Sequence, residues 1–406
     1  MFGRRCIALC AVVAVALMPV VAGPAAAGPP GANTASSAIV RAWERTSIRT
    51  IYAEAATPIP VGALYLGFTS LAMYRAAQAV GAHASAEAAI AVAAHDVLRE
   101  YFPTSTAALD ADLASSLAAV ADGPAERRGI LIGGRIAERL IAERAGDGRG
   151  DISIVYTREP APGVWQPNPG GTMLAPWLGF VRPLMLRGPF TPRGVNGPDE
   201  LTSATYAADL AEVQRLGSAE STLRTPAQTD TARFFNSNSA IMVTEGLLGY
   251  LDTRPMGLID SARLVAAMHT AMSDAIITCW RLKYDEGFWR PSQAIREADQ
   301  DGNPATSSDP AWTPLLPNPP YPDYVSGHGC LTSPAVEVIR RTLGERTALT
   351  LHSYVTGADR TFPTLRALED QAFQARIWSG LHFRTAMHDA YAIGHETADR
   401  VLLRLG

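Results

Sequence analysis

Three short clusters between residues 283 and 382 hold the side chains whose types and spacing are best suited to chemistry. They combine basic, hydroxyl, glycine and imidazole groups, and they are Lys283 with Arg290-Pro291, Ser326-Gly327-His328, and Arg376 with His382. A buried, multiply charged oxyanion requires such a set, because the hydrogen bonds that it loses with water must be replaced by charged and neutral donors. The clusters therefore predict a pocket for a tetrahedral oxyanion.

The positive charges and the neutral donors of this pocket come from different residue types. Lys283 is the only lysine among the 406 residues, so an ammonium stands where a chain rich in Arg could have used a guanidinium. Because an ammonium is a compact point charge, we expect Lys283 to contact the anion directly, with Arg290 and Arg376 as the other cations. The Ser326 hydroxyl and the Gly327 N–H supply neutral donors, and glycine lets the backbone approach closely.

Two histidines, His328 and His382, complete the set. A reaction at a tetrahedral oxyanion can pass through a trigonal bipyramid, which has two opposite apices. One imidazole can bond to the central atom, and the other can exchange a proton with the opposite apical oxygen. Each residue alone also fits a solvated helix end, a turn or a satisfied core histidine, and it is the joint order and spacing that favour the site.

Hydrophobic periodicity predicts an all-α protein of helical bundles joined by long proline-rich loops. A first helix is expected from about Ile39 until Pro58. Irregular, proline-rich segments are expected at 149–200 and 285–332. The other expected helices are 61–80, 85–102, 106–122, 125–145, 203–216, 224–235, 240–251, 260–284, 363–378 and 383–404.

These elements place the clusters at helix ends. The helix 260–284 carries Lys283 at its C-terminal end, and the junction at Ser379-Gly380 separates Arg376 from His382. Ser333-Pro334 has the form of a helix start and predicts a helix from there through Leu343. One short strand is expected at 347–355.

The N-terminal segment has the pattern of an export signal. Arg4-Arg5 precede an apolar run that is interrupted by Pro19, and the small-residue site Ala25–Ala27 follows. We therefore expect a signal peptide at 1–27, no stable membrane anchor, and a secreted or extracytoplasmic protein.

The remainder is expected to be one all-α domain, 28–406. Its N-terminal half, 28–200, would hold helices and a loop, and its second half, 201–406, would carry the anion site. The formal charge of −4 and the isoelectric point of about 6.1 give no basic surface for nucleic acid, so none is expected as a partner.

Two cysteines outside the signal segment flank the clusters. Cys279 stands four residues before Lys283, and Cys330 stands two residues after His328. An exported protein can form disulfides, so one bridge beside the pocket is possible. Two buried free thiols remain an equal alternative, because the sequence does not give their separation.

The three clusters resemble a signature shared by type 2 phosphatidic acid phosphatases, bacterial acid phosphatases and vanadium-dependent haloperoxidases. That signature is Lys, six residues, Arg-Pro; then Pro-Ser-Gly-His; then Ser-Arg, five residues, His, three residues, Asp. The first element matches fully, the second in three positions of four, and the third in its Arg-to-His spacing. Trp165–Pro183 and Tyr206–Phe235 are also similar to the soluble bacterial haloperoxidase-like branch.

The resemblance to haloperoxidases implies vanadate as cofactor and a role for each matching residue. His382 would coordinate the vanadium, His328 would act as acid and base at the opposite apex, and Lys283 would also polarise bound peroxide. The equatorial oxygens would be held by Lys283, Arg290, Ser326, Gly327 and Arg376. Hydrogen peroxide would oxidise a halide to a hypohalous species that reacts with a small organic acceptor, and the family often pairs into homodimers.

Two alternatives stay open. In an acid phosphatase, phosphate would occupy the same site, His382 would form a phosphohistidine, and His328 would protonate the leaving group. The third interpretation is a non-catalytic bundle that only binds an oxyanion.

Three positions depart from the signature. Val325 replaces Pro, Ala375 replaces Ser, and Ala386 replaces the Asp that would orient the imidazole of His382. Asp389 lies three residues further along, and whether it or another acid replaces the missing carboxylate is open.

Overall fold

The computed structural model describes residues 34–167 and 171–406, and it confirms the all-α class. The predicted signal peptide lies outside the described residues. The first half contains α1 (Thr34–Ile48), which continues into a π-helical turn (Arg49–Glu54), α2 (Ile59–Ala79), α3 (Ala86–Tyr101), α4 (Thr106–Ala118) and α5 (Pro124–Glu143). These bounds agree with the expected helices to within a few residues.

Small residues let these helices pack closely. Gly129 and Gly133 lie on the face of α5 that meets α3, where a Cβ would come within 2.4 Å of the backbone oxygens of Ser85 and Ala89. Any larger residue would therefore force the two helices apart. This stripe explains why an Ala- and Gly-rich sequence forms a tight bundle here.

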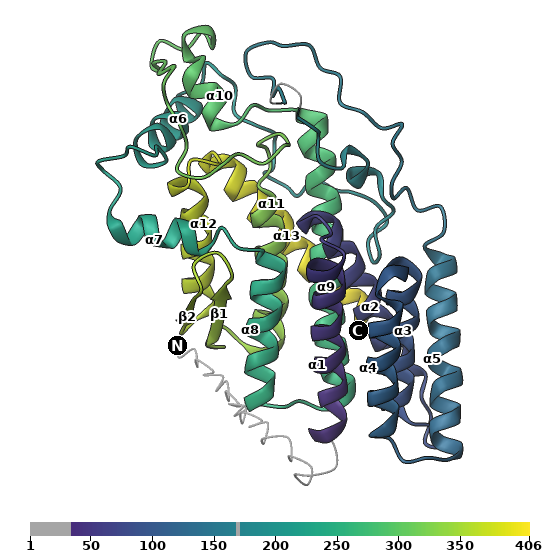
Figure 1. The fold of residues 1–406 in the computed structure, drawn as a ribbon. Helices are drawn as coiled ribbons and strands as arrows, with labels where there is room; N and C mark the ends of the chain where they lie inside the picture. The colour runs from purple at the N-terminus through teal and green to yellow at the C-terminus, as the bar shows by residue number, and fades with distance from the viewer. Residues whose placement is uncertain (1–33, 168–170) are drawn as a thin grey trace, which may run out of the picture.

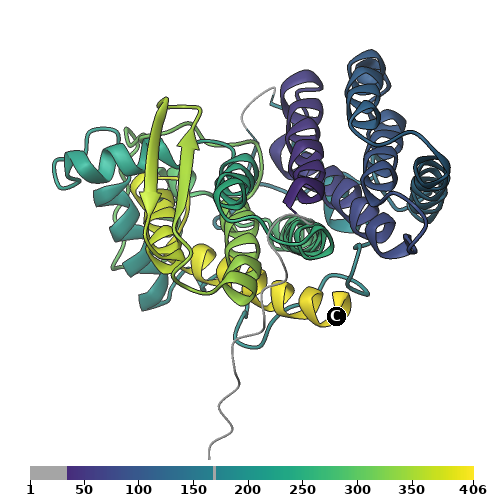
Figure 2. The same ribbon diagram turned by 90° about the horizontal axis from the view of Figure 1, so that it is seen from below.

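The second half carries the remaining helices and a small hairpin. They are α6 (Ala204–Leu216), α7 (Pro226–Phe234), α8 (Ser239–Thr253), α9 (Leu258–Glu286), α10 (Pro291–Arg296), α11 (Gly327–Leu343), β1 (Leu349–Ser353), β2 (Ala358–Phe362), α12 (Leu365–Trp378) and α13 (Arg384–Leu405). The long α9 lies between the two halves, as Figures 1 and 2 show, and it packs against α1 and α2 on one side and α11 and α13 on the other. The division into halves within one domain remains a prediction.

The proline-rich segment after α5 is irregular, as expected, apart from a short 3-10 turn at Pro176–Phe180. A buried carboxylate on α9 anchors it: Asp274 accepts hydrogen bonds from the backbone N–H groups of Leu184, Met185 and Leu186 at 2.6, 2.8 and 2.8 Å. The loop is thus held against the central helix.

One local prediction was wrong. The helix expected to start at Ser333-Pro334 begins at Gly327, with Ser326 as its N-cap and Pro334 inside it. Proline removes one backbone donor, but the Ser333 hydroxyl donates to the Gly329 carbonyl at 2.9 Å, and close packing on α13 holds the turn. The strand expected at 347–355 is confirmed as β1, and it pairs antiparallel with a second strand, β2, which the periodicity did not reveal.

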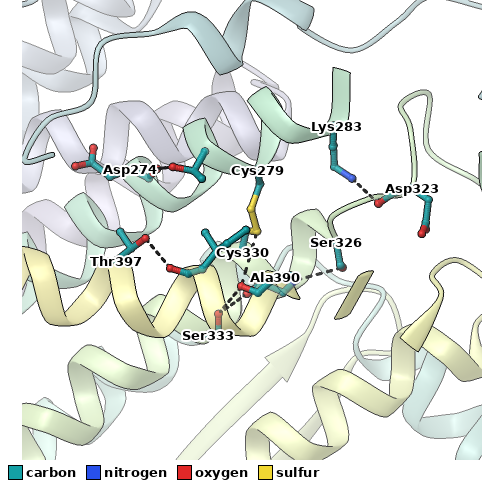
Figure 3. Close-up of a disulfide and its surroundings, with 12 residues drawn as sticks. Asp274, Cys279, Lys283, Asp323, Ser326, Cys330, Ser333, Ala390 and Thr397 are labelled. Atoms are coloured by element: carbon teal, nitrogen blue, oxygen red, sulfur yellow. Dashed lines mark hydrogen bonds between the residues drawn. A yellow bond between two sulfur atoms is a disulfide. The ribbon is translucent and has the colours of Figure 1, made fainter. Parts of the chain in front are cut away.

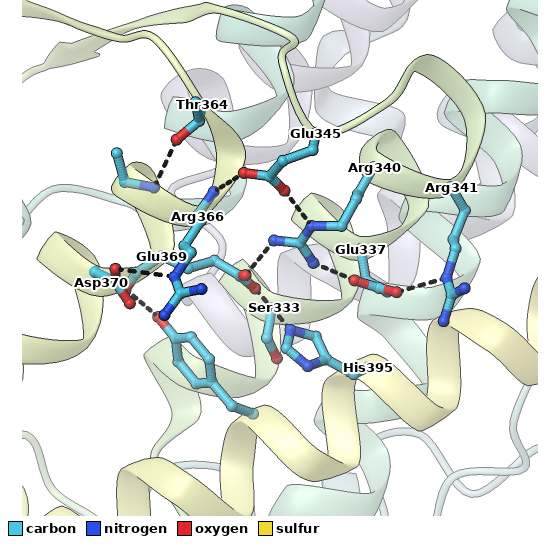
Figure 4. A network of polar contacts seen from close by, with 12 residues as sticks. Ser333, Glu337, Arg340, Arg341, Glu345, Thr364, Arg366, Glu369, Asp370 and His395 are labelled. Carbon is cyan, nitrogen blue, oxygen red and sulfur yellow. Dashed lines mark hydrogen bonds and ion pairs between the residues drawn. The ribbon is translucent and has the colours of Figure 1, made fainter.

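A polar network ties together the three helices that follow the second cluster. Arg340 on α11 contacts Glu337 and Glu369 and lies 2.7 Å from Glu345, while Glu369 on α12 contacts His395 on α13 at 2.7 Å (Figure 4). Single surface ion pairs contribute little, but a network that shares one guanidinium restrains the relative placement of its helices.

Within the described chain, no helix is long and apolar enough to cross a membrane.

Candidate active site

The fold brings all three sequence clusters to one place. Lys283 lies in the last turn of α9, Ser326 caps α11, and the α12–α13 junction carries Arg376 and His382. Backbone groups of 321–323 and 381 link them, because Lys283 donates to the Asp323 carbonyl and Arg290 to the Leu381 carbonyl, each at 2.9 Å. Figure 3 shows Lys283, Asp323 and Ser326 together.

Lys283 is fully buried at the end of α9. Its ammonium donates to the carbonyls of Pro322 and Asp323 at 2.9 Å and lies 4.9 Å from the ring centre of Tyr321. Burial, followed by repulsion from Arg290, lowers the pKa of Lys283 well below its usual value. A nearby anion acts in the opposite direction and favours the charged ammonium.

The two arginines are equally buried but differently engaged. The Arg290 guanidinium donates to the carbonyls of Tyr321 at 2.7 Å and Leu381 at 2.9 Å. Arg376 makes one long contact, 3.5 Å, to the Phe235 carbonyl, and its Nε is buried with no hydrogen-bond partner among the described residues. Arg376 therefore retains donor capacity for a ligand.

The second cluster forms the N-terminus of α11. The Ser326 hydroxyl accepts a hydrogen bond from the Gly329 N–H at 3.3 Å, so its own hydrogen is still available to a ligand. A Cβ on Gly327 would lie 3.0 Å from the Trp280 ring, so glycine suits this close approach. The helix N-terminus adds partial positive charge to the pocket.

His328 follows on the first turn of α11. Its side chain is partly exposed, but its Nε2 is buried and has no hydrogen-bond partner in residues 34–167 and 171–406. Burial, followed by the charge of Arg376, lowers the pKa of His328 well below its usual value. A neutral imidazole with an open ring nitrogen can accept a proton.

His382 has a partner that the sequence did not reveal. Its Nδ1 lies 2.6 Å from Oδ1 of Asp323, and both side chains are buried. Burial, followed by the charge of Arg290, lowers the pKa of His382, while burial raises the pKa of Asp323 to about 7. The second candidate acid, Asp389, instead accepts a hydrogen bond from the Tyr324 hydroxyl. The available signal was an acid only three residues before Ser326.

The charge balance of these residues indicates the ligand. Among the described residues, Asp323 is the buried carboxylate that acts on Lys283 and Arg290, and Arg376 adds a further cation. The pocket therefore carries net positive charge even when Lys283 is neutral. The orphaned nitrogens of His328 and Arg376 also need partners. Across the described ranges there is no group of three or more His, Cys, Asp or Glu side chains that could hold a metal cation. The residues thus fit an oxyanion such as vanadate or phosphate.

A disulfide links two of the helices that form the pocket. Cys279 on α9 and Cys330 on α11 are bonded, so of the two alternatives the bridge is the one found (Figure 3). It joins the helix that carries Lys283 to the helix that carries Gly327 and His328.

A cleft of about 400 Å³ opens beside the pocket and shares Arg290 with it. Its walls combine proline rings with amide and charged side chains, and they include Pro160, Pro162, Trp165, Gln166, Gln293, Arg296, Glu297, Asn318, Pro319 and Pro320. A small organic molecule fits this space.

Comparison with known proteins finds a match in the part of the chain that holds all three clusters. Residues 263–405 match a family model described as "VCPO second helical-bundle domain". This part of the chain is therefore similar to the second helical-bundle domain of vanadium chloroperoxidases. A curated relative, vanadium chloroperoxidase from Curvularia inaequalis, is 36% identical over 92 residues. That match covers 20% of this chain and only 14% of the relative's length.

Solved vanadium haloperoxidases share the fold over most of the chain. A bacterial vanadium-dependent iodoperoxidase aligns with a TM-score of 0.74 at 19% identity, covering 93% of this chain and 98% of the other. A holo-type bacterial vanadium-dependent chloroperoxidase aligns with a TM-score of 0.65 at 18% identity, covering 86% and 92%. At these identities the likeness establishes the fold, and the activity has to be argued from the pocket.

Proposed function

We propose that this protein is a vanadate-dependent haloperoxidase, which uses hydrogen peroxide to oxidise a halide. The observation that carries the proposal is the buried, positively charged pocket of Lys283, Arg290 and Arg376 around His382. This pocket lies in the part of the chain that matches a helical-bundle domain of vanadium chloroperoxidases. When bound, vanadate supplies a Lewis acid that activates peroxide without changing its own oxidation state.

The chain's own residues have distinct tasks in this proposal. The Lys283, Arg290 and Arg376 side chains, together with Ser326 and Gly327, would hold the oxygens of the bound oxyanion. Because His382 Nδ1 contacts Asp323, its Nε2 would be the nitrogen that holds the vanadate.

His328 is the proton acceptor. Burial and Arg376 hold its pKa low, so the imidazole is neutral and can remove a proton from hydrogen peroxide. Lys283, which a bound anion would keep protonated, would stabilise negative charge that develops on the activated peroxide. The adjacent cleft offers space for a small organic acceptor of the hypohalous product.

Export from the cytoplasm is part of the proposal. The disulfide between Cys279 and Cys330 supports it, because such bonds persist mainly in oxidising compartments.

An acid phosphatase is the second candidate, and one contact favours keeping it. A phosphatase needs a carboxylate that orients the imidazole of His382, and position 386 does not provide one. Asp323 supplies this carboxylate instead. In that reaction His382 Nε2 attacks phosphorus, and His328 protonates the leaving oxygen.

One assay series separates these functions. Protein purified without vanadate is given vanadate, hydrogen peroxide and iodide, bromide or chloride with phenol red or another halogen acceptor, and separately an aryl phosphate without vanadate. Vanadate-dependent halogenation that is lost in His382→Ala is the expected result. Phosphate release that vanadate inhibits, without halogenation, would assign the phosphatase, and phosphate binding without either activity would assign the non-catalytic bundle.

A further inference from the structure

The contact between Asp323 and His382 is isolated from solvent and held from the backbone. Both side chains are at most 1% exposed, and Nδ1 lies 2.6 Å from Oδ1. The backbone of Asp323 is anchored on both sides, because its N–H donates to the Phe288 carbonyl and its own carbonyl accepts from Lys283, each at 2.9 Å. The carboxylate is therefore presented to His382 from a fixed loop.

At two other positions an acid could have oriented His382, but neither provides one. Position 386, where the family signature has Asp, is Ala386. Asp389 is engaged with Tyr324. Asp323 and Ala386 line the same small cavity of about 10 Å³, so a carboxylate from the 321–323 segment occupies the region that position 386 also faces.

We propose that Asp323 is the positioning residue of His382: it accepts the Nδ1–H, fixes that tautomer and directs the Nε2 lone pair at the bound oxyanion. This inference rests on the proposed function, since vanadate is the ligand whose binding it strengthens. A carboxylate partner also makes the imidazole a better electron donor, and loss of such a partner typically lowers the affinity of a bound metal centre by about 10- to 100-fold.

The first test measures vanadate affinity by equilibrium dialysis, independently of turnover. The isosteric Asp323→Asn variant should bind vanadate about 10- to 100-fold more weakly than wild type, with an unchanged melting temperature. Asp389→Asn is the matched control, because it removes an acid near the site that does not contact His382, and its affinity should stay within about twofold of wild type. Equal affinities of wild type and a folded Asp323→Asn would overturn the proposal.

The second test moves the carboxylate back to the position in the signature. Asp323→Ala combined with Ala386→Asp keeps the number of carboxyl groups around the shared cavity unchanged. The double variant should recover part of the affinity lost in Asp323→Ala alone. A folded double variant that binds as weakly as the single variant would count against an orienting role.

A third measurement needs no vanadate and so separates this inference from the proposed function. In ¹⁵N-labelled protein, the His382 imidazole, assigned with His382→Ala, should carry its proton on Nδ1 in wild type and lose this preference in Asp323→Ala. A proton on Nε2 in wild type would refute the inference. Wild-type protein that binds no vanadate yet shows the Nδ1 proton would refute the proposed function alone.

Discussion

Helix α9 buries ionisable side chains near its middle and at its C-terminal end. The group near the middle is neutral, whereas the group at the end keeps its positive charge. Near its middle, His269 lies 3.2 Å from Glu44 and contacts Ser70 and Thr244 at 2.6 and 2.9 Å. Burial raises the pKa of Glu44 to about 8 and lowers that of His269 to about 3, so both are neutral at pH 7.

At the C-terminal end of the same helix the positive charges cannot be removed by deprotonation. Arginine remains protonated in proteins, so Arg290 and Arg376 keep their charges even where burial lowers the pKa of Lys283. The two groups are 14 residues apart, roughly 21 Å along the helix. The neutral cluster of Glu44 and His269 needs no counter-ion, because both groups lose their charge on burial. The positive cluster of Lys283, Arg290 and Arg376 needs an anion and thereby marks the site.

The largest effect is expected from the covalent link at the pocket end. The disulfide joins α9 to α11 and closes a loop with a sequence separation of 51. Replacing Cys279 and Cys330 by Ala should therefore lower the free energy of unfolding by about 4 kcal/mol, measured by urea denaturation. A reductant should destabilise wild type similarly and leave the double variant unchanged. Equal stability of both proteins would contradict the prediction.

The next largest effect concerns the pocket's ligand rather than its stability. If the proposed function holds, Lys283→Met removes one cation that would contact the anion and should lower kcat/KM for halide oxidation by about 10²- to 10³-fold, or about 3 to 4 kcal/mol. Lys283→Arg should also impair the reaction, because a planar fork does not reproduce a point charge. Full activity of Lys283→Arg would refute the argument from the single lysine.

Most of the fold could be predicted because its helices obey their own periodicity. The strand β2 (Ala358–Phe362) escaped because its burial does not alternate, with a single buried residue at its end. The start of α11 was misplaced because Pro334 has the form of a first-turn residue, whereas tertiary packing tolerates it inside the helix.

The candidate site divides in the same way. Residues with a fixed local spacing, such as Lys283 with Arg290, were recognisable in the sequence, and the fold brings them together as expected. Asp323 was not, because its partner lies 59 residues away and only the folded chain places the two side chains together. Contacts between loops have no periodicity from which they can be predicted. The catalytic and cofactor-binding roles of these residues stay predictions until the variants are measured.

A third buried ionisable group on α9, Asp274, tests how much stability a carboxylate gains from backbone donors. It is anchored by three backbone N–H donors from the loop after α5. Asp274→Ala leaves these donors unpaired and should cost about 2 to 3 kcal/mol in urea denaturation. Asp285→Asn is the matched control on the same helix, because its pair with Arg281 is exposed and should contribute less than about 1 kcal/mol. Equal losses in both variants would show that the loop is held by other contacts.

The neutral cluster predicts a specific pH dependence of stability. Glu44 keeps a proton in the folded state that the unfolded chain releases above its pKa of 4.5, so the free energy of unfolding falls as pH rises towards 8. In the folded state His269 stays unprotonated down to about pH 3, whereas the unfolded chain takes up this proton below pH 6.5. The free energy of unfolding therefore also falls as pH decreases from 6.5 towards 3. The two slopes oppose each other between 4.5 and 6.5, and Glu44 dominates above that window.

Glu44→Gln removes the Glu44 contribution, both above pH 6.5 and in the range from 4.5 to 6.5 where it opposes that of His269. Between pH 6.5 and 8 the variant should lose roughly 2 kcal/mol less stability than wild type, while its acidic decline through His269 remains. Urea denaturation at half-unit pH steps measures both limbs. Parallel curves for the two proteins would mean that Glu44 is already charged when buried, and the contrast between the middle and the C-terminal end of α9 would then disappear.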